Sequence, residues 1–274
     1  MLGELLDNVR RRRPLIHNIT NYVTVNDCAN ILLACGGSPI MADDIGEVEE
    51  ITALCGGLNI NIGTLNARTI PAMLAAGKKA NELGHPAVLD PVGAGASALR
   101  TETALRLLEQ VRFSVIRGNI SEIKTLALGR GSSTKGVDAD VGDAVRSDTL
   151  EDAVRFVKGF ARRKGAVVAV TGAIDIVADA GRAWCIFNGH PMMSGVTGTG
   201  CQLSAMTAAF VTANPDRVLE AAAAAVSAMG VCGDLAHRRL GGLDGNSSYR
   251  NYIIDAVYHL DGGTLDRMAN YKVL

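Results

Sequence analysis

The 274-residue chain lacks a surplus of charge of either sign. Its 27 lysines and arginines are balanced by 28 aspartates and glutamates, which leaves a formal net charge of −1. Proteins that bind nucleic acid or anionic membranes usually carry a basic face. The one basic run, Arg10–Arg13, is typical of the solvated end of a helix. We therefore expect neither nucleic acid nor a membrane as a partner.

Cysteine pairs and a secretion segment are also missing. The six cysteines have no C-x-x-C spacing, which is typical of reduced thiols in a cytoplasmic protein. The N-terminus is amphipathic and has no long apolar signal segment. The most apolar stretch, Leu219–Cys232, is interrupted by Glu220 and Ser227, so we expect it to be too short and too weakly apolar to span a bilayer.

Aromatic residues are scarce at 4%, whereas glycine occurs 31 times and hydrophobic residues make up 48%. This composition favours a large core in which backbone packs closely on backbone. The length and the absence of a linker favour a single domain that spans residues 1–274. Residues 129–148, which are rich in Gly, Ser, Asp and Lys, are expected to form a mobile loop.

Short apolar runs alternate with helical patterns along the chain. Strands are predicted at residues 15–19, 39–41, 58–62, 86–92, 113–117, 167–170, 174–178 and 184–187. Helices are predicted at residues 2–12, 25–33, 47–54, 71–83, 101–111, 121–128, 148–163, 217–239, 249–260 and 265–272, and after Cys201. Continuous apolar strands between helices predict an α/β fold whose mostly parallel sheet is covered on both faces. The consecutive strands after residue 167 indicate a hairpin, which fits a mixed sheet better than a TIM barrel.

The glycine-rich stretch Gly195–Cys201 precedes an apolar helix. A loop of this kind exposes unpaired N–H groups and the positive end of the helix dipole, and therefore favours an anion. A tight turn that enters a core helix is the alternative interpretation.

Ligands of open α/β sheets bind at the carboxyl ends of the strands. Five predicted elements deliver small or polar groups there, namely Gly63-Thr64, Asp90–Gly95, Arg117–Glu122, Thr171-Gly172 and the glycine loop. An arginine offers a planar fork to phosphate oxygens, and two carboxylates can hold Mg²⁺ through its waters. An N-cap or a salt bridge is the alternative role for each acid, and it is favoured for Glu122 taken alone.

Other motifs are weak or absent. No G-x-x-x-x-G-K-[ST] sequence occurs, and the five histidines show no metal-binding spacing. Gly93–Ala98 loosely matches a dinucleotide-binding loop, which keeps a nicotinamide-dependent enzyme as an alternative. Cys201 with His17 or His190 would make a nucleophile and base only if the fold brought them together.

Six blocks of sequence then occur in order. They are His17–Asn21, Ser38–Ala42, Leu89–Ala94, Arg117–Glu122, Val170–Gly172 and Gly198–Cys201. Together they resemble the hydroxyethylthiazole kinases of the ribokinase-like superfamily, over almost the whole chain. The resemblance implies a three-layer α/β/α fold with a mostly parallel central sheet, and a homotrimer with active sites near the subunit interfaces.

The resemblance also implies a function in thiamine salvage. The enzyme would use ATP and Mg²⁺ to phosphorylate the primary hydroxyl of 4-methyl-5-(2-hydroxyethyl)thiazole. The alternatives are a kinase of another small heterocycle such as a pyrimidine alcohol, a nicotinamide-dependent enzyme, and a nucleotide sensor without turnover.

The resemblance also implies a role for individual residues, each assigned by its position in the matching blocks. Met41, Asn21 and Gly198 would bind the substrate, Arg117, Thr171 and Asn119 would bind the nucleotide, and Asp90 and Glu122 would support the metal. Gly198, Thr199, Gly200 and Cys201 would form the anion hole. Cys201 stands where superfamily relatives commonly carry an aspartate base, and would accept the proton. We expect the helix dipole to lower its thiol pKa.

Overall fold

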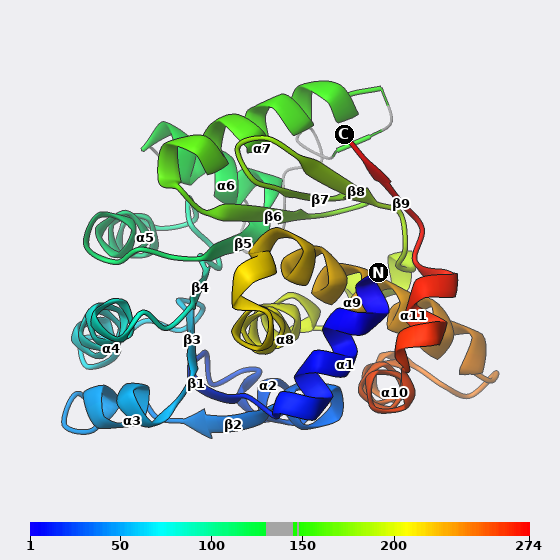
Figure 1. The fold of residues 1–274 in the computed structure, drawn as a ribbon, viewed down its shortest axis with the longest axis horizontal. Coiled ribbons are helices and arrows are strands. Elements are labelled where there is room, and N and C mark those ends of the chain that lie inside the picture. The colour runs from blue at the N-terminus through cyan, green and yellow to red at the C-terminus, as the bar shows by residue number, and fades with distance from the viewer. Residues whose placement is uncertain (130–144, 147) are drawn as a thin grey trace.

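The computed structural model describes residues 1–129, 145–146 and 148–274, so the loop expected at 129–148 lies almost wholly outside the described residues. In the described part, nine strands form one sheet in the order β2-β1-β3-β4-β5-β6-β7-β8-β9 (Figure 1). The strands are β1 Leu15–Ile19, β2 Ser38–Met41, β3 Gly57–Asn61, β4 Ala87–Asp90, β5 Val115–Asn119, β6 Val167–Thr171, β7 Asp175–Ala178, β8 Ala183–Ile186 and β9 Tyr271–Val273.

The sheet is mixed. Strands β2, β1, β3, β4, β5 and β6 are parallel, and β7, β8 and β9 run antiparallel to their neighbours. The hairpin expected after residue 167 is therefore confirmed. Because the parallel strands share one direction, their carboxyl ends lie along one edge of the sheet.

Helices cover both faces of the sheet (Figure 1). One face carries α3 Val48–Leu54, α4 Thr69–Leu83, α5 Ala98–Gln110, α6 Ile120–Leu128 and α7 Leu150–Lys164. The other carries α1 Leu2–Arg12, α2 Val25–Cys35, α8 Thr199–Ala213, α9 Val218–Arg239, α10 Asn246–His259 and α11 Gly262–Met268. Short 3₁₀ helices span Pro191–Gly195 and Pro215–Arg217.

Each face of the sheet has its own hydrophobic core. Successive side chains of a strand point to opposite faces, and on β4 Val88 joins one core while Ala87 and Leu89 join the other. Both faces are thus buried, which is why the strands are continuous apolar runs in the sequence. The predicted three-layer α/β/α architecture is confirmed.

Helix α9 is central to the layer that contains α8 and α10. Among the described residues, one helical segment, Pro215–Arg239, is long and apolar enough to cross a membrane by length and composition alone. The expectation that this region is too short was therefore wrong. However, 78% of its apolar window is buried inside the protein, where α9 packs against α8 and α10. That environment is typical of a core helix.

Most element boundaries differ from the prediction by one to three residues, and two of the differences have a clear physical cause. The helix expected at 101–111 begins at Ala98, because the Ser97 hydroxyl caps it by accepting the Arg100 N–H (3.3 Å). The helix expected at 265–272 ends at Met268, and Tyr271–Val273 pairs with β8 instead. The ring of Tyr271 lies 4.5 Å from that of Trp184, centroid to centroid, so packing on an available strand edge outweighs the local helical pattern.

Candidate active site

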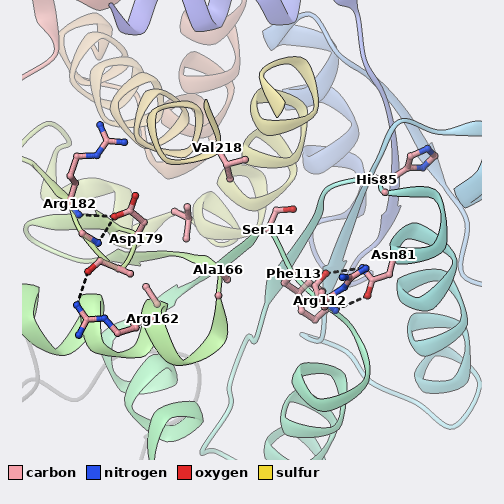
Figure 2. A pocket seen from close by; sticks show the side chains of 16 residues that line it. Asn81, His85, Arg112, Phe113, Ser114, Arg162, Ala166, Asp179, Arg182 and Val218 are labelled. Carbon is pink, nitrogen blue, oxygen red and sulfur yellow. Dashed lines mark hydrogen bonds between the residues drawn. The ribbon is translucent and has the colours of Figure 1, made fainter. Parts of the chain in front are cut away.

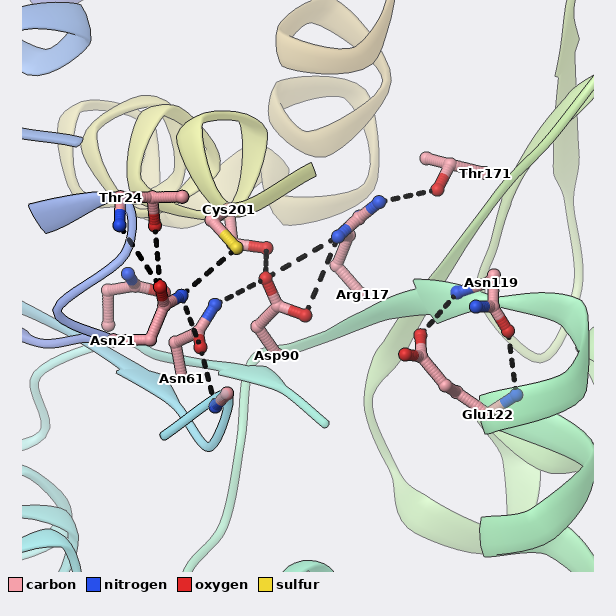
Figure 3. Close-up of polar contacts among 12 residues, drawn as sticks. Asn21, Thr24, Asn61, Asp90, Arg117, Asn119, Glu122, Thr171 and Cys201 are labelled. Carbon is pink, nitrogen blue, oxygen red and sulfur yellow. Dashed lines mark hydrogen bonds and ion pairs between the residues drawn. The ribbon is translucent and has the colours of Figure 1, made fainter. Parts of the chain in front are cut away.

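Polar side chains from the carboxyl ends of the parallel strands meet beside the N-terminus of α8 (Figure 3). Sheet register brings them together, because Asn61 lies opposite Asp90 on β3 and β4, and Asn119 lies opposite Thr171 on β5 and β6. The expected gathering of strand ends is therefore confirmed. The polar cluster consists of Asn21, Thr24, Asn61, Asp90, Arg117, Thr171, Cys201 and Ser204.

Asp90 lies at the centre of the polar cluster and is completely buried. Its Oδ2 accepts hydrogen bonds from Asn61 Nδ2 (2.9 Å) and Ser204 Oγ (2.8 Å). The Nη1 of Arg117 lies 3.4 Å from the same oxygen. Burial raises the pKa of Asp90, and these three partners oppose the rise. The salt bridge that sequence offered as an alternative role for this acid does exist.

Arg117 joins three elements at the site. Besides Asp90 on β4, it contacts β6, where its Nη2 donates to Thr171 Oγ1 (2.6 Å). It also lies directly against the backbone of Gly200 in α8, since a Cβ at that position would collide with the guanidinium. The Nε of Arg117 is buried and has no hydrogen-bond partner among the described residues.

The glycines of the loop serve close packing. Gly198 is the N-cap of α8 and has a φ of +87°, a left-handed conformation that favours glycine. A Cβ there would also collide with the methyl group of Thr24, which is the N-cap of α2. The N-termini of α2 and α8 are therefore in direct contact, and the positive ends of both helix dipoles lie beside the polar cluster.

Glu122 lies in the first turn of α6 and is buried. Its Oε1 accepts the N–H of Gly93 and its Oε2 the N–H of Asn119, both at 2.8 Å. Asn119 Oδ1 accepts the Glu122 N–H in return (2.8 Å), which completes a capping box. The cap is therefore Asn119, and the helix expected at 121–128 begins one residue earlier, at Ile120. Burial and the charge of Asp90 raise the pKa of Glu122 to about 7.

Cys201 lies in the first turn of α8, and its Sγ accepts a hydrogen bond from Asn21 Nδ2 (3.2 Å). The expected depression of its thiol pKa is wrong. Burial raises the pKa of Cys201, and the nearby Asp90 charge raises it further. Loss of water around the sulfur and a neighbouring carboxylate outweigh the helix dipole.

Two further predicted residues lie at the same edge. Thr199 is the first residue of α8. Met41 is the last residue of β2, where it is half-buried, packs against the core that contains α8, and lies opposite Asn18 of β1 in the sheet. Both therefore flank the strand ends, on the side of the site that Asn21 occupies.

The histidine and dinucleotide alternatives find no support in the geometry. The ring nitrogens of His17 are both engaged, with Thr52 Oγ1 and the Ala42 carbonyl (2.9 Å each), so this ring is not available to Cys201. His190 stacks on His237, with ring centroids 3.4 Å apart. The N–H of Gly93, in the glycine loop after β4, is used by Glu122.

Several site residues were missed in the sequence. Asn61 was not identified as a site residue because it lies within a predicted strand, although Asn59 and Asn61 alternate with apolar residues there. Ser204 follows Cys201 by three positions, a spacing that places both on one face of a helix. No sequence motif pointed to Arg100. Its guanidinium donates to the carbonyl groups of Gly63 (2.8 Å) and Val92 (3.3 Å) and so connects the segments that follow β3 and β4.

A groove of about 660 Å³ lies elsewhere (Figure 2). Its floor includes Phe113 and Val167, and Arg112, Arg162 and Arg182 lie around it. Because Ser114 and Val167 precede or begin β5 and β6, the groove is at the amino edge of the sheet, opposite the polar cluster. The groove is therefore separate from the polar cluster.

Comparisons with known proteins show the family to which the chain belongs. A family model described as the hydroxyethylthiazole kinase family matches residues 6–262. A protein named hydroxyethylthiazole kinase from Clostridium acetobutylicum is 68% identical over 272 residues, which cover 99% of each chain. The solved structure of hydroxyethylthiazole kinase from Pyrococcus horikoshii has a TM-score of 0.88 at 36% identity, covering 100% of this chain and 98% of that one.

The fold has more distant relatives. A ribokinase-like superfamily protein from Enterococcus faecalis has a TM-score of 0.62 at 12% identity, covering 92% of this chain and 88% of that one. At that identity the likeness concerns the fold alone, and it confirms the predicted ribokinase-like architecture. The family resemblance of the six sequence blocks is confirmed as well.

Proposed function

The chain belongs to the hydroxyethylthiazole kinase family, and from this premise we propose how its residues phosphorylate the hydroxyl of 4-methyl-5-(2-hydroxyethyl)thiazole. The chain is a kinase of this thiazole alcohol, and a pyrimidine alcohol or a nicotinamide cofactor is not favoured. We propose that residues 1–274 form one kinase domain and that ATP is the phosphoryl donor.

Arg117 and Thr171 are proposed to bind the phosphates of ATP, with Asn119 beside them. The support is the unpartnered, buried Nε of Arg117, because an unsatisfied buried donor is costly and a phosphate oxygen would satisfy it. The guanidinium is already held in one orientation by Asp90 and Thr171. Little rotamer freedom would therefore be lost when the nucleotide binds.

Asp90 and Glu122 are proposed to hold Mg²⁺, in part through its waters. The donor set fits, because Mg²⁺ is usually bound by one or two carboxylates and keeps several waters. Burial raises the pKa of Glu122 and the charge of Asp90 adds to the rise, as expected for two carboxyls that repel each other when ionised. A divalent cation relieves that repulsion, and when bound it neutralises charge on the phosphates.

The acceptor side of the site is proposed to lie between β2 and α8. Met41 and Gly198 would contact the thiazole, and the amides of Gly198–Cys201 would hold the transferring phosphoryl group. The first amides of a helix have no partner within the helix, and here they are backed by two helix dipoles.

The transfer itself follows from this arrangement. The alcohol oxygen bonds to the γ-phosphorus while the bond from phosphorus to the β–γ bridging oxygen breaks, and ADP leaves with the electron pair. The alcohol proton passes to Cys201 Sγ. Because the transition state is loose, positioning and charge neutralisation contribute more than the base does. The raised pKa of Cys201 limits the thiolate fraction at neutral pH.

The assembly is proposed to be a homotrimer whose active sites lie near subunit interfaces. Tyr22 and Val23 follow Asn21 directly, and Ile45 follows Met41 closely. Their exposures of 78%, 58% and 54% are typical of apolar side chains that a partner covers. We also propose that the enzyme acts in the cytoplasm, since all six cysteines are unpaired.

The observation that carries the function is 68% identity over nearly the full chain, together with the polar cluster at the strand ends. A coupled assay of ADP release tests it, with the thiazole alcohol, a hydroxymethylpyrimidine and a sugar alcohol as acceptors. We expect release to be fastest with the thiazole. Equal or faster turnover of either other alcohol would contradict the assignment.

A further inference from the structure

The side-chain amide of Asn21 is saturated by the protein. Its Oδ1 accepts two hydrogen bonds from Thr24, one from the backbone N–H and one from Oγ1, both at 3.1 Å. Its Nδ2 donates to Asn61 Oδ1 (3.0 Å) and to Cys201 Sγ (3.2 Å). An asparagine amide has two acceptor sites and two donor hydrogens, so no capacity remains for a substrate.

The direction of these hydrogen bonds is fixed at both ends. The backbone N–H of Thr24 can only donate, which identifies the oxygen of Asn21 and leaves its nitrogen toward the sulfur. On the other side, the backbone N–H of Gly63 donates to Asn61 Oδ1 (2.9 Å), and Asn61 Nδ2 donates to the Asp90 carboxylate. Cys201 Sγ is therefore the acceptor of its bond with Asn21.

Burial keeps this arrangement from reorganising. Asn21 and Thr24 are only 4% and 3% exposed, so a flip of the amide would set its NH2 group against the Thr24 N–H and its oxygen against Asn61 Oδ1, where water cannot relieve the mismatch. The contact of the Thr24 methyl with Gly198 ties the same residues to the N-terminus of α8. The sulfur and its donor consequently belong to one packed unit.

We propose that Asn21 is a positioning residue, which holds Cys201 Sγ as a hydrogen-bond acceptor by donating one amide hydrogen to it, and that it does not bind the thiazole directly. A donor to sulfur favours the form that can accept a proton and directs a thiol S–H away from Asn21. This inference rests on the proposed role of Cys201 as proton acceptor.

A double-mutant cycle of Asn21→Ala and Cys201→Ala tests the proposal, with kcat and both KM values measured for all four proteins. Asn21→Ala is expected to lower kcat about tenfold in the parent, because a tenfold change in rate corresponds to the free energy of roughly one hydrogen bond. In the Cys201→Ala background it should lower kcat further by less than about twofold, because the atom that it positions is gone. The KM for the thiazole should stay within about twofold in both backgrounds.

Thr24→Val provides a milder second variant. It removes the hydroxyl that orients Asn21 but keeps the methyl group against Gly198, so the substitution leaves no cavity that would destabilise the fold. We expect a several-fold loss of kcat in the parent and none in the Cys201→Ala background.

The matched control is Asn59→Ala, which removes a buried amide that pairs with Asn18 on neighbouring strands (3.1 Å). It should lower the free energy of unfolding and leave kcat unchanged in both backgrounds.

The outcomes separate the possibilities. An equal loss of kcat from Asn21→Ala in both backgrounds would overturn the positioning role. A raised thiazole KM in both backgrounds would overturn it in favour of direct substrate binding. If Cys201→Ala alone were fully active, the proton-acceptor role of Cys201 would fail, independently of what Asn21 does.

Discussion

At the residue scale, Arg117 is the side chain whose replacement is most informative, because it contacts β4, β6 and α8 at once. A lysine is a compact point charge and cannot reproduce the planar fork that reaches both Asp90 and Thr171. We expect Arg117→Lys to raise the dissociation constant of ATP about tenfold or more, with thiazole affinity nearly unchanged. Calorimetric titration of both ligands measures this, and an unchanged ATP affinity would reduce Arg117 to a structural ion pair.

Replacement of Cys201 provides a test in which one variant is expected to retain activity. An aspartate has an ordinary pKa near 4, so even after burial it is ionised more readily than the thiol. We expect Cys201→Asp to be at least as active as the parent, and Cys201→Ala to lose about 10²–10⁴-fold, the usual value of base catalysis. The comparison uses kcat at neutral pH. A folded but inactive aspartate variant would contradict the proton-acceptor role.

The sequence predicted which residues gather at the strand ends better than it predicted their contacts. Glycines 198 and 200 were predicted to form an anion hole, and in this structure the groups closest to them are the Thr24 methyl and the Arg117 guanidinium. The thiol pKa of Cys201 was predicted in the wrong direction, because the dipole of its own helix is a local feature, whereas burial and Asp90 come from the tertiary fold. Distant partners of this kind have no signal in a local pattern.

At the element scale, regular segments were predictable and their ends were less so. Periodicity located the strands of the parallel sheet, since both of their faces are buried. The start of α6 was predicted one residue late, because Asn119 and Ser121 are both good caps and only the reciprocal bond with Glu122 selects Asn119. Strand β9 was predicted as helix because its pairing partner β8 is far away in the sequence.

The turn between β6 and β7 gives a pH-dependent prediction. Burial raises the pKa of Asp175, the first residue of β7, to about 7, from an ordinary value of 3.8. Between about pH 4 and 7 the folded chain therefore holds a proton that the unfolded chain releases, so stability falls as pH rises through this window. Urea unfolding of the parent and of Asp175→Asn across pH 4.5–7.5 measures the effect. The slope should be smaller in the variant, and an identical slope would contradict this assignment.

At the scale of the whole molecule, the alternation of helices and apolar strands was sufficient to predict three layers and the edge of the sheet where the polar strand ends gather. The assembly left no comparable pattern, because an interface is not periodic. The exposed apolar side chains Tyr22, Val23 and Ile45 lie beside the site and identify the surface to test.

Sedimentation at micromolar concentration tests the proposed homotrimer. The parent should have three times the mass of one chain, and Tyr22→Glu together with Val23→Lys should shift it toward the monomer, because charges would be buried at an interface. Leu243→Lys, a change at a fully exposed apolar residue far along the chain, serves as the control and should not change the mass. A monomeric parent would reject the trimer.

The central claim is that this polar cluster transfers a phosphoryl group from ATP to the thiazole alcohol. Phosphorus-31 NMR of the protein with ATP, Mg²⁺ and 4-methyl-5-(2-hydroxyethyl)thiazole tests it most directly, because it identifies the product as well as the loss of ATP. The account predicts a growing phosphomonoester resonance that matches the ADP formed, one for one. Formation of ADP with inorganic phosphate and no phosphomonoester, or no change in ATP, would contradict it.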